Sequence, residues 1–248
     1  MFKPEIPLLR SPLILENKII PRDFGILCWN VHKENLKPEF DTMVKNWIRL
    51  FDMNILLFQE AVFPDNLFSV AGLSYAAAAN IRIHRLHFGV LTAAMADIHT
   101  KTDVMSLARE SMVATRKNAL ITRYWLSSGE LLLVVNIHAV NFTSRAWYLW
   151  EFSRLLKTLQ HHQGPLVLAG DFNCWNRSRQ KIVNNLAQAL SLRQARPRRT
   201  GLVKQFFGFE LDRIYYRQLS LLEMDALENR LFSDHNPLVA RFACKPAQ

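Results

Sequence analysis

The sequence predicts an α/β (α+β) fold, a four-layer α/β/β/α sandwich in which two mixed β-sheets pack face to face and helices cover their outer faces. Two observations lead to this prediction. The chain repeats the order strand, helix, strand, and polar residues follow the strands at matching places in both copies. At 248 residues, half of them hydrophobic, the chain can bury a core of this size as one domain.

The first copy spans residues 24–58. Residues 24–31 are apolar and β-prone, and residues 55–58 are apolar again, so each segment is predicted to be a strand. Between them, the apolar residues from Phe40 to Phe51 recur at the spacing of one helical face. The pattern therefore predicts two strands joined by a helix.

The second copy has strands at residues 131–137 and 166–169, and residues 148–159 present one apolar helical face between them. Asn136-Ile137-His138 matches Asn30-Val31-His32, and Asp171 matches Glu60. We therefore expect polar residues from both copies to gather at one rim of the two sheets. Chance similarity between two ordinary βαβ units is the alternative, and periodicity alone does not distinguish the two.

The remaining elements are predicted from shorter patterns. Strands are expected at residues 88–94, 117–122, 206–216 and 237–242, a helix at residues 182–190, and loops at residues 97–103 and 196–201. Residues 1–21 are expected to form an arm, and residues 22–246 a single domain.

The formal net charge is +10, and most of it lies in one segment. Residues 172–209 contain no Asp or Glu but carry eight basic residues, which leaves +2 for the rest of the chain: Arg177, Arg179, Lys181, Arg193, Arg196, Arg198, Arg199 and Lys204. Such a segment would attract a polyanion, either nucleic acid or an acidic membrane surface. A solvated basic face that serves only solubility predicts the same pattern.

Several features indicate the compartment. The chain has no run of eighteen uncharged apolar residues, and three charged residues interrupt its first ten positions, so we expect a cytoplasmic protein. The cysteines Cys28, Cys174 and Cys244 are odd in number and lack zinc-ligand spacing, which predicts buried free thiols. No feature indicates an obligate protein partner.

Three carboxylates stand at the edges of apolar runs. Asp171 follows residues 166–170, Glu60 follows residues 54–58, and Asp234 precedes the apolar residues 237–242. An ionised acid is costly to bury unless a cation meets it. We therefore hypothesise that these acids share a metal ion, as in a metal-assisted hydrolase.

Two short motifs suggest how water and phosphate would be handled. Alternation places Asp171 and Asn173 on one side of an extended segment, where one can accept a water proton and the other can donate to a phosphate oxygen. A plain Asx turn is the structural alternative. In Asp234-His235, the carboxylate can orient the imidazole, or the two residues can form an ordinary solvated pair.

The order of the polar motifs along the chain is more specific than any one of them. The motifs are Trp29-Asn30-Val31-His32, Phe58-Gln59-Glu60-Ala61, Phe88-Gly89-Val90-Leu91, Asn136-Ile137-His138, Gly170-Asp171-Phe172-Asn173, Leu211-Asp212-Arg213-Ile214 and Ser233-Asp234-His235-Asn236-Pro237. In this order the chain resembles the endonuclease/exonuclease/phosphatase superfamily, which has the DNase I-like fold. The resemblance runs over residues 24–242 and is greatest to a largely uncharacterised bacterial branch.

The resemblance implies a magnesium ion, for which Mn²⁺ can substitute. Glu60 would be its principal ligand, with Asn30 and Asp234 close by, and few protein ligands suffice because Mg²⁺ keeps several waters. The resemblance also implies that Lys117 and Arg145 reach substrate phosphate, with a plain surface cation as the alternative for either, and Arg177 is a further candidate to bind substrate.

The resemblance also implies catalytic roles. His235, oriented by Asp212, and Asp171 would position and activate the attacking water, and either can take its proton. Asn173 would hold a phosphate oxygen, and His138 would stabilise the phosphorane or assist the leaving oxygen.

His138 is similar to the residue of the DNase, lipid-phosphatase, sphingomyelinase and deadenylase-like members, whereas abasic-site repair relatives usually carry tyrosine there. In nuclease members a glutamate supports this histidine, but residues 66–96 of this chain contain no acid. Either Asp97, Asp103 or Glu110 replaces it from the loop, or His138 acts without a supporting acid.

Three functions follow as expectations. The first is a Mg²⁺-dependent phosphodiester hydrolase acting on nucleic acid, an endonuclease or exonuclease. The second is a lipid or small-molecule phosphoesterase, sphingomyelinase-like or a phosphatase, whose basic segment meets an acidic membrane surface. The third is a catalytically silent nucleic-acid-binding module, against which the intact set of site residues argues.

Overall fold

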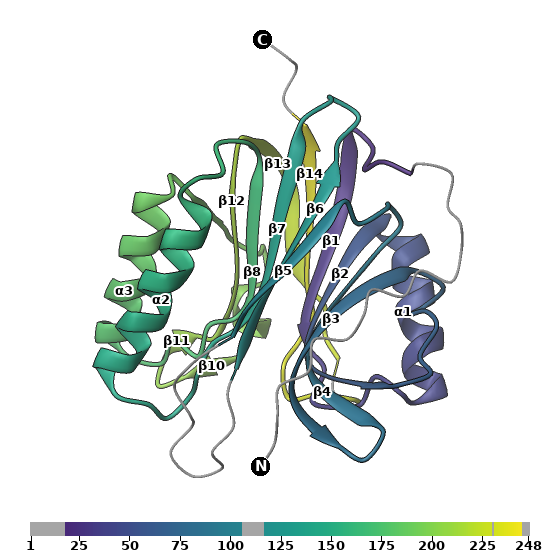
Figure 1. Cartoon of the computed structure of the whole chain (residues 1–248), viewed down its shortest axis with the longest axis horizontal. Coiled ribbons are helices and arrows are strands. Elements are labelled where there is room, and N and C mark those ends of the chain that lie inside the picture. Colours follow the sequence, from purple (N-terminus) through teal and green to yellow (C-terminus); the bar gives the residue numbers. More distant parts are fainter. Residues whose placement is uncertain (1–17, 106–116, 230, 245–248) are drawn as a thin grey trace.

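Two six-stranded β-sheets pack face to face in the computed structural model of the chain, which describes residues 18–105, 117–229 and 231–244. Helix α1 (Pro38–Leu50) covers the outer face of one sheet, and helices α2 (Arg145–Leu159) and α3 (Arg177–Ala189) cover the other (Figure 1). The predicted four-layer α/β/β/α sandwich is confirmed. Among the described residues, no helix is both long and apolar enough to span a membrane.

The first sheet contains one parallel pair, β1 with β2, and all its other neighbours are antiparallel. Its strand order is β13 (Leu219–Ala226), β14 (Leu238–Cys244), β1 (Asp23–Asn30), β2 (Met53–Pro64), β4 (Leu86–Ala94), β3 (Ser74–Ile83).

The second sheet is built in the same way around the parallel pair of β7 and β8. Its order is β5 (Thr100–Met105), β6 (Asn118–Trp125), β7 (Leu131–His138), β8 (Leu166–Asp171), β12 (Asp212–Arg217), β9 (Arg193–Ala195). A 3₁₀ turn (Thr200–Leu202) and a two-stranded hairpin of β10 (Gln205–Phe206) and β11 (Phe209–Glu210) lie between β9 and β12.

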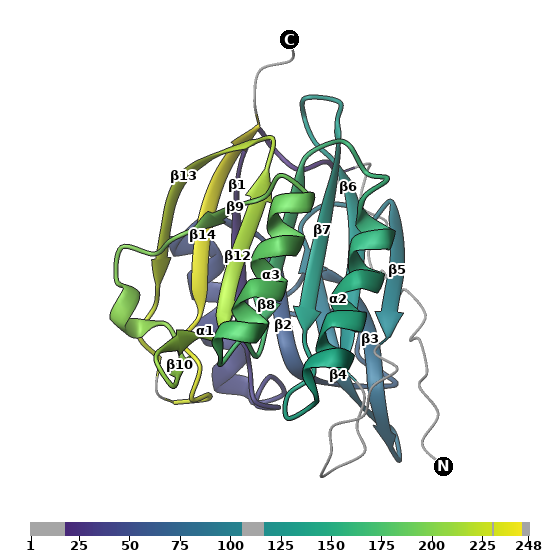
Figure 2. The ribbon, with the colours of Figure 1, turned by 90° about the vertical axis from the view of Figure 1, so that its left-hand side faces the viewer.

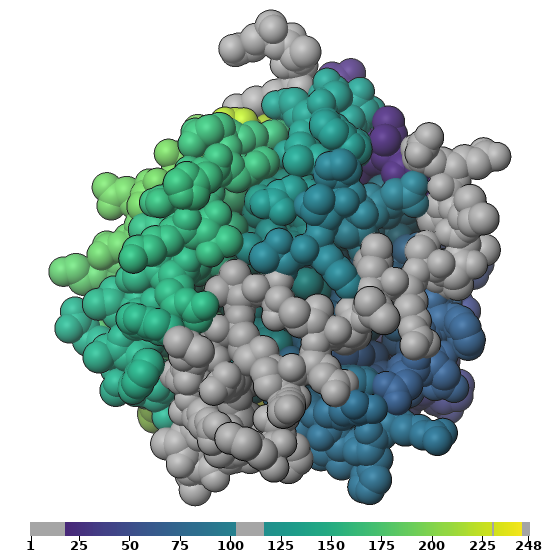
Figure 3. All heavy atoms as spheres, viewed as in Figure 1, coloured from purple at the N-terminus to yellow at the C-terminus, as the bar shows by residue number. Residues whose placement is uncertain are grey.

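Apolar side chains fill all three interfaces between the four layers. Ile26 and Val134 belong to the cluster between the two sheets. Under α1, Trp29 stacks on Phe40 with ring centroids 5.1 Å apart, and Phe152 lies in the cluster under α2 and α3. Each such side chain contributes roughly 1.5–3 kcal/mol on burial. On the face shown in Figure 3, side chains close the space between α2 and the strands of the second sheet.

Side-chain caps fix where α2 and α3 begin. The Ser144 hydroxyl accepts a hydrogen bond from Trp147 N–H, and the Asn176 side chain accepts one from Arg179 N–H. These caps satisfy backbone donors that a helix N-terminus leaves free. Because α2 follows β7 and α3 follows β8, both helices start at the rim where those two parallel strands end (Figure 2).

Most predicted elements are confirmed, and two are wrong. Residues 97–103 were predicted as a loop, but β5 begins at Thr100 and pairs with β6. Residues 206–216 were predicted as one strand, but Phe207 and Gly208 have left-handed φ angles of 50° and 77° and turn the chain between β10 and β11 before β12 begins.

Strands β3, β9 and β13 were not predicted. In β3, residues 76–79 are four consecutive alanines, which have low strand propensity and no polar alternation. Pairing with β4 makes this segment a strand, and this pairing places all four alanines in the interior.

The two halves of the molecule match at the strand ends, though not in the predicted register. Val31 N–H donates at 2.9 Å to the carbonyl of Gln59, the last β2 residue paired with β1, and Ala139 N–H donates at 2.8 Å to the carbonyl of Asp171, the last β8 residue paired with β7. The last residues of β1 and β7, Asn30 and His138, are therefore equivalent. The predicted match of Asn30 with Asn136 is two residues out of register.

The part of the predicted arm that the structure describes is its end. Ile20 is fully buried in the cluster between the sheets and forms an isolated β-bridge with Leu126. Residues 1–17 lie outside the described residues.

Candidate active site

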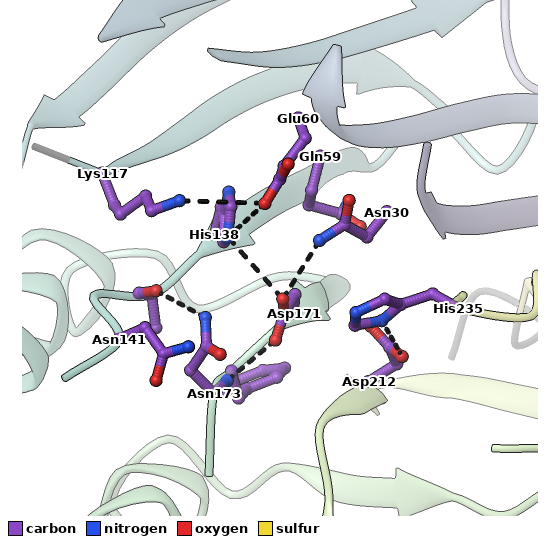
Figure 4. A network of polar contacts seen from close by, with 12 residues as sticks. Asn30, Gln59, Glu60, Lys117, His138, Asn141, Asp171, Asn173, Asp212 and His235 are labelled. Atoms are coloured by element: carbon purple, nitrogen blue, oxygen red, sulfur yellow. Dashed lines mark hydrogen bonds and ion pairs between the residues drawn. The ribbon is translucent and has the colours of Figure 1, made fainter. Parts of the chain in front are cut away.

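The parallel strands of both sheets end at one rim, and polar side chains gather there (Figures 1 and 4). Asn30 comes from the end of β1, Glu60 from β2, His138 from the end of β7 and Asp171 from the end of β8. The register pairs His138 with Asp171 directly. The four predicted residues therefore meet, although they come from two sheets.

A glycine allows β8 to approach β7 closely enough for this pairing. Gly170 has φ +147°, and a Cβ atom added to it would lie 1.9 Å from the carbonyl oxygen of Ile137. Any other residue would push the two strands apart just before Asp171. Gly170 therefore sets the distance between the side chains that end β7 and β8.

Asp171 is the centre of the polar network. Its Oδ2 accepts a hydrogen bond from Asn30 Nδ2 at 3.2 Å and lies 3.6 Å from His138 Nε2. Its Oδ1 accepts a hydrogen bond from Asn173 N–H at 2.9 Å. Burial raises the pKa of Asp171 above its ordinary value, and the neighbouring carboxylate of Asp212 raises it further.

A bulge in β2 directs Glu60 into the site. The register with β4 shifts between Phe58 and Ala61, and Glu60 has a left-handed φ of 51°. Gln59 points instead between the sheets, where its Nε2 donates to Asn136 Oδ1 at 2.6 Å. The bulge thus places two consecutive polar side chains, one in the core and one at the rim.

Glu60 faces three groups that can carry positive charge. Its carboxylate oxygens lie 3.3 Å from Lys33 Nζ, 3.9 Å from Lys117 Nζ and 3.8 Å from His138 Nε2. Burial opposes ionisation, but His138, which is protonated only at low pH, and the permanent charges of Lys117 and Lys33 lower the pKa of Glu60 to about 2. Glu60 is therefore a permanent anion in the working pH range.

His138 is 5 % exposed and lies between Glu60 and Asp171. Burial lowers its pKa well below the ordinary value, and the charge of Lys117 lowers it further. The imidazole is therefore neutral, and Lys33 and Lys117 are the charges that balance Glu60. Of the acids expected to support His138, Asp97 accepts a hydrogen bond from Lys18 N–H instead. The side chains of Asp103 and Glu110 lie outside the described residues.

A second pair, Asp212 and His235, lies beside this network. Asp212 is directly opposite Asp171 in the β12–β8 register, and its Oδ2 is 2.7 Å from His235 Nδ1. Burial disfavours the imidazolium, but Asp212 outweighs it and raises the pKa of His235 to about 9. Trp29 Nε1 donates to the carbonyl of His235 at 2.7 Å and fixes its backbone. The predicted orientation of His235 by Asp212 is present in the structure.

The residues at this rim fit a divalent cation. Within the described residues, Asp171, Asp212 and His235 offer ligand atoms that all lie within 4.8 Å of one another. Asp212 Oδ1 is buried without a hydrogen-bond partner, so it has a free lone pair for a cation. Carboxylate oxygens are the ligands that Mg²⁺ and Mn²⁺ prefer.

Of the three metal ligands expected from the resemblance, two lie in the polar network around Asp171 and the third, Asp234, is bound to a lysine. Asn30 and Glu60 flank Asp171 and His138. Asp234 is more exposed, its Oδ2 binds Lys204 Nζ at 2.7 Å, and its Oδ1 lies 3.9 Å from His235 Nε2. An ion at Asp234 would therefore have to compete with Lys204.

Asn173 follows Asp171 with a left-handed φ of 46°. Its N–H caps the Asp171 carboxylate, and its Nδ2 donates to the carbonyl of Ala139 at 2.9 Å. Asn173 therefore joins the two chain segments that leave β7 and β8. Nδ2 carries a second N–H, so Asn173 can donate to a phosphate oxygen, its expected role, while it remains bound to Ala139.

Sequence reasoning missed a buried arginine under the site. Arg179 is 2 % exposed, and its guanidinium donates to the carbonyls of Val140, Asn173 and Thr143 at 3.0, 2.8 and 3.2 Å. It is one of the eight cations expected from the sequence to attract a polyanion, and its burial removes it from that set. The signal was its spacing, because Arg179 lies three residues before Ile182 on the apolar face of α3.

The residues expected to bind substrate are dispersed. Lys117 faces Glu60, whereas Arg145 and Arg177 are exposed at the first positions of α2 and α3. In the basic segment, Arg199 is paired with Asp225 and Lys204 with Asp234. The segment therefore does not present all eight cations to one ligand. The three cysteines are buried free thiols, as predicted.

Comparison with known proteins identifies the family and the fold. Residues 27–235 match the model of the Endonuclease/Exonuclease/phosphatase family. A family protein from Leptotrichia buccalis superimposes with a TM-score of 0.66 at 14% identity, covering 88% of this chain and 99% of that one. A family protein from Bacteroides vulgatus gives a TM-score of 0.66 at 13% identity, covering 90% and 99%.

The human Nocturnin catalytic domain, solved with a bound sulfate anion, gives a TM-score of 0.60 at 17% identity and covers 91% of this chain and 96% of that one. The chain has the DNase I-like sandwich fold, and proteins of this family are generally hydrolases. The chain belongs to the endonuclease/exonuclease/phosphatase family, whose members include nucleases, phosphodiesterases and phosphatases and typically depend on a divalent metal.

Proposed function

We propose that this protein hydrolyses phosphodiesters of nucleic acid with Mg²⁺, for which Mn²⁺ can substitute. One observation carries the proposal: His138 lies 3.8 Å from Glu60 and 3.6 Å from Asp171, and Asp171 is directly opposite the Asp212–His235 pair. The rim brings together two anions, a neutral imidazole and a second imidazole held by a carboxylate. In-line attack on phosphorus requires these parts.

Glu60 and Asn30, together with Asp171 and Asp212, would hold the ion. When bound, the ion would polarise the phosphoryl group. Two groups can take the proton of the attacking water. Asp171 is one, and His235 is the other once it has released the proton that Asp212 stabilises. His138 can donate to an equatorial or leaving oxygen, and Asn173 can donate to a non-bridging oxygen through its second amide N–H, while the first remains bound to Ala139.

The choice of nucleic acid rests on charge. Residues 172–209 contain no acid, and the exposed residues Arg177 and Lys181 lie in the first two turns of α3, which starts at the rim of the site. Exposed cations beside a phosphodiester site favour a polyanionic substrate over a neutral one.

The test is cleavage of supercoiled plasmid and of an end-labelled single strand with Mg²⁺, Mn²⁺ or chelator. We expect nicking or shortening only with metal, and a loss of at least 100-fold in Asp171→Asn. Asp41→Asn on α1, an acid whose side chain is 43 % exposed and paired with Lys45, is the matched control and should keep full activity. Metal-independent cleavage, or none of either substrate, would refute the proposal, and binding without cleavage would favour the silent binding module.

A lipid phosphodiester is the second candidate, because α2 exposes three large apolar side chains. Trp147, Leu149 and Trp150 are 49 %, 43 % and 36 % exposed, and the Arg154 guanidinium lies 4.9 Å from the Trp150 ring centroid. Tryptophan and arginine together are typical of surfaces that rest on a membrane interface. Hydrolysis of sphingomyelin vesicles but not of DNA would establish this second function.

A further inference from the structure

Four aromatic side chains form a contiguous cluster on the rim of the site: Phe142, Trp175, Phe206 and Phe207, here called the rim cluster. They come from three segments, the loop after β7, the loop after β8 and the β10–β11 hairpin. Figure 2 shows the hairpin and the starts of α3 and α2 along the same lower edge. Nothing in the proposed chemistry uses these rings.

The rings follow one another in contact. Phe142 and Trp175 have centroids 6.3 Å apart, Trp175 and Phe206 6.4 Å, and Phe206 and Phe207 4.4 Å. Trp175 lies only two residues after Asn173, which joins the segments that leave β7 and β8. The cluster therefore begins at the candidate phosphate-binding residues and leads away from them.

The cluster is fixed from below rather than loosely attached. Trp175 Nε1 donates to Asn141 Oδ1 at 2.9 Å, and the buried Arg179 guanidinium lies 4.7 Å from the Trp175 ring centroid. Phe207 stands at the turn of the hairpin, where its φ of 50° and that of Gly208 reverse the chain. A ring presented on a tight turn loses little conformational freedom when a ligand packs on it.

The outer rings are nevertheless exposed to solvent. Phe207 is 77 % exposed, Phe142 58 % and Phe206 42 %. Single exposed apolar residues are normal, but a contiguous patch beside a site marks a binding surface. Exposure of these rings to water is unfavourable, and a ligand with flat apolar faces would cover them.

Charge selects the ligand. Three of the four rings lie in the acid-free residues 172–209, and residues 139–150 around Phe142 also contain no Asp or Glu. Arg177 is exposed two positions after Trp175, whereas Lys204, which precedes the hairpin, is paired with Asp234. Glu210 at the end of the hairpin is an acid close to the cluster, so the complementarity rests on the exposed Arg177 and on the aromatic faces, which suit unpaired bases on a phosphate backbone.

We propose that the rim cluster stacks the bases of a single-stranded nucleic acid next to the scissile phosphodiester, an inference that rests on the proposed function. Duplex DNA hides its base faces, so only an unpaired segment can use these rings. The protein therefore binds single strands more tightly than duplexes, with little dependence on sequence.

The test is a binding measurement in chelator, so that no cleavage is needed. Fluorescence anisotropy with the full chain would compare labelled oligothymidylate, the matching duplex and a base-free abasic strand with the same number of phosphates. We expect Phe207→Ala to bind oligothymidylate about 5- to 100-fold more weakly than wild type, and the abasic strand equally well. Phe207→Trp should retain binding.

Phe68→Ala is the matched control, because Phe68 is 65 % exposed but belongs to the loop between β2 and β3. The inference is overturned if Phe207→Ala binds oligothymidylate as Phe68→Ala does, or if its loss is equal on the abasic strand. It is also overturned if the loss appears only on phosphatidylglycerol vesicles, since the cluster would then contact a membrane.

The two proposals fail separately. Base-dependent binding that Phe207→Ala removes, without metal-dependent cleavage of any nucleic acid, refutes the nuclease and retains the stacking surface. Metal-dependent cleavage of nucleic acid, together with an unchanged affinity of Phe207→Ala for oligothymidylate, refutes the stacking surface and retains the nuclease.

Discussion

The Nδ1 atom of His235 lies 2.7 Å from Oδ2 of Asp212, and both residues are buried although they are 23 positions apart. This contact determines the charge of the imidazole, because Asp212 raises the pKa of His235 to about 9 against the effect of burial. It also makes the stability of the protein depend on pH.

The first prediction concerns this pair. A histidine whose folded pKa of about 9 exceeds its unfolded value contributes stability in full below about pH 6.5 and loses it as the pH rises through 9. Asp212→Asn should remove this contribution, on the order of 1–3 kcal/mol at pH 6.5. Urea unfolding in chelator at pH 6.5 and pH 10 measures it. Wild type and variant should differ at pH 6.5 and converge at pH 10, and a constant difference would contradict the assignment.

The second prediction concerns the metal. Mg²⁺ bound only by the folded state should raise the melting temperature of the wild type. Glu60→Gln should reduce this increase and weaken apparent Mg²⁺ affinity at least about 10-fold, because an amide replaces the permanently ionised oxygen ligand. Thermal unfolding over a Mg²⁺ titration measures both. Glu223→Gln, an exposed acid on β13, should leave the increase unchanged. An identical titration for Glu60→Gln would exclude Glu60 as a ligand.

The third prediction concerns the buried arginine. Arg179→Met keeps apolar volume but leaves the carbonyls of Val140, Asn173 and Thr143 without their donor. We expect a loss of about 2–4 kcal/mol in the free energy of unfolding. Lys181→Met, two residues along the same helix but exposed, should change it by less than about 0.5 kcal/mol. Equal losses would show that Arg179 does not hold these loops.

The fourth prediction compares two glycines. Gly170→Ala would place a Cβ 1.9 Å from the Ile137 carbonyl oxygen, whereas Gly201→Ala meets nothing within 4 Å. Gly170→Ala should lower the free energy of unfolding by about 3 kcal/mol or more and reduce phosphodiesterase activity, because β8 carries Asp171. Gly201→Ala should be nearly neutral. Chemical denaturation of both variants measures the difference, and a neutral Gly170→Ala would show that β7 and β8 can separate without cost.

Much of the fold could be predicted because short-range sequence patterns specify its strands and helices. The apolar runs that became β1, β2, β7 and β8 are each followed by a polar residue, and parallel strands bring their ends to one edge. The prediction failed where pairing overrides local preference, as in the alanines of β3, and where a turn is set by backbone angles, as at Phe207.

The candidate site could be predicted only in part. Its expected members Asn30, Glu60, His138 and Asp171 do meet, and Asp212 does hold His235. Further roles stay predictions, including those of Arg145 and Arg177. The equivalence of Asn30 with His138, instead of with Asn136, could not be predicted from the sequence, because hydrogen bonds between strands set the register in each half.

By itself the sequence determined the family, the four-layer architecture and the gathering of acids at strand ends, because residue spacing and hydrophobic period act within a few positions of the chain. Only the tertiary structure decided that Arg179 is buried, that Lys204 neutralises Asp234, and that aromatic rings from three segments line one rim. Such contacts join residues 30 or more positions apart, and their geometry depends on the packing of whole sheets and helices, which no local pattern encodes.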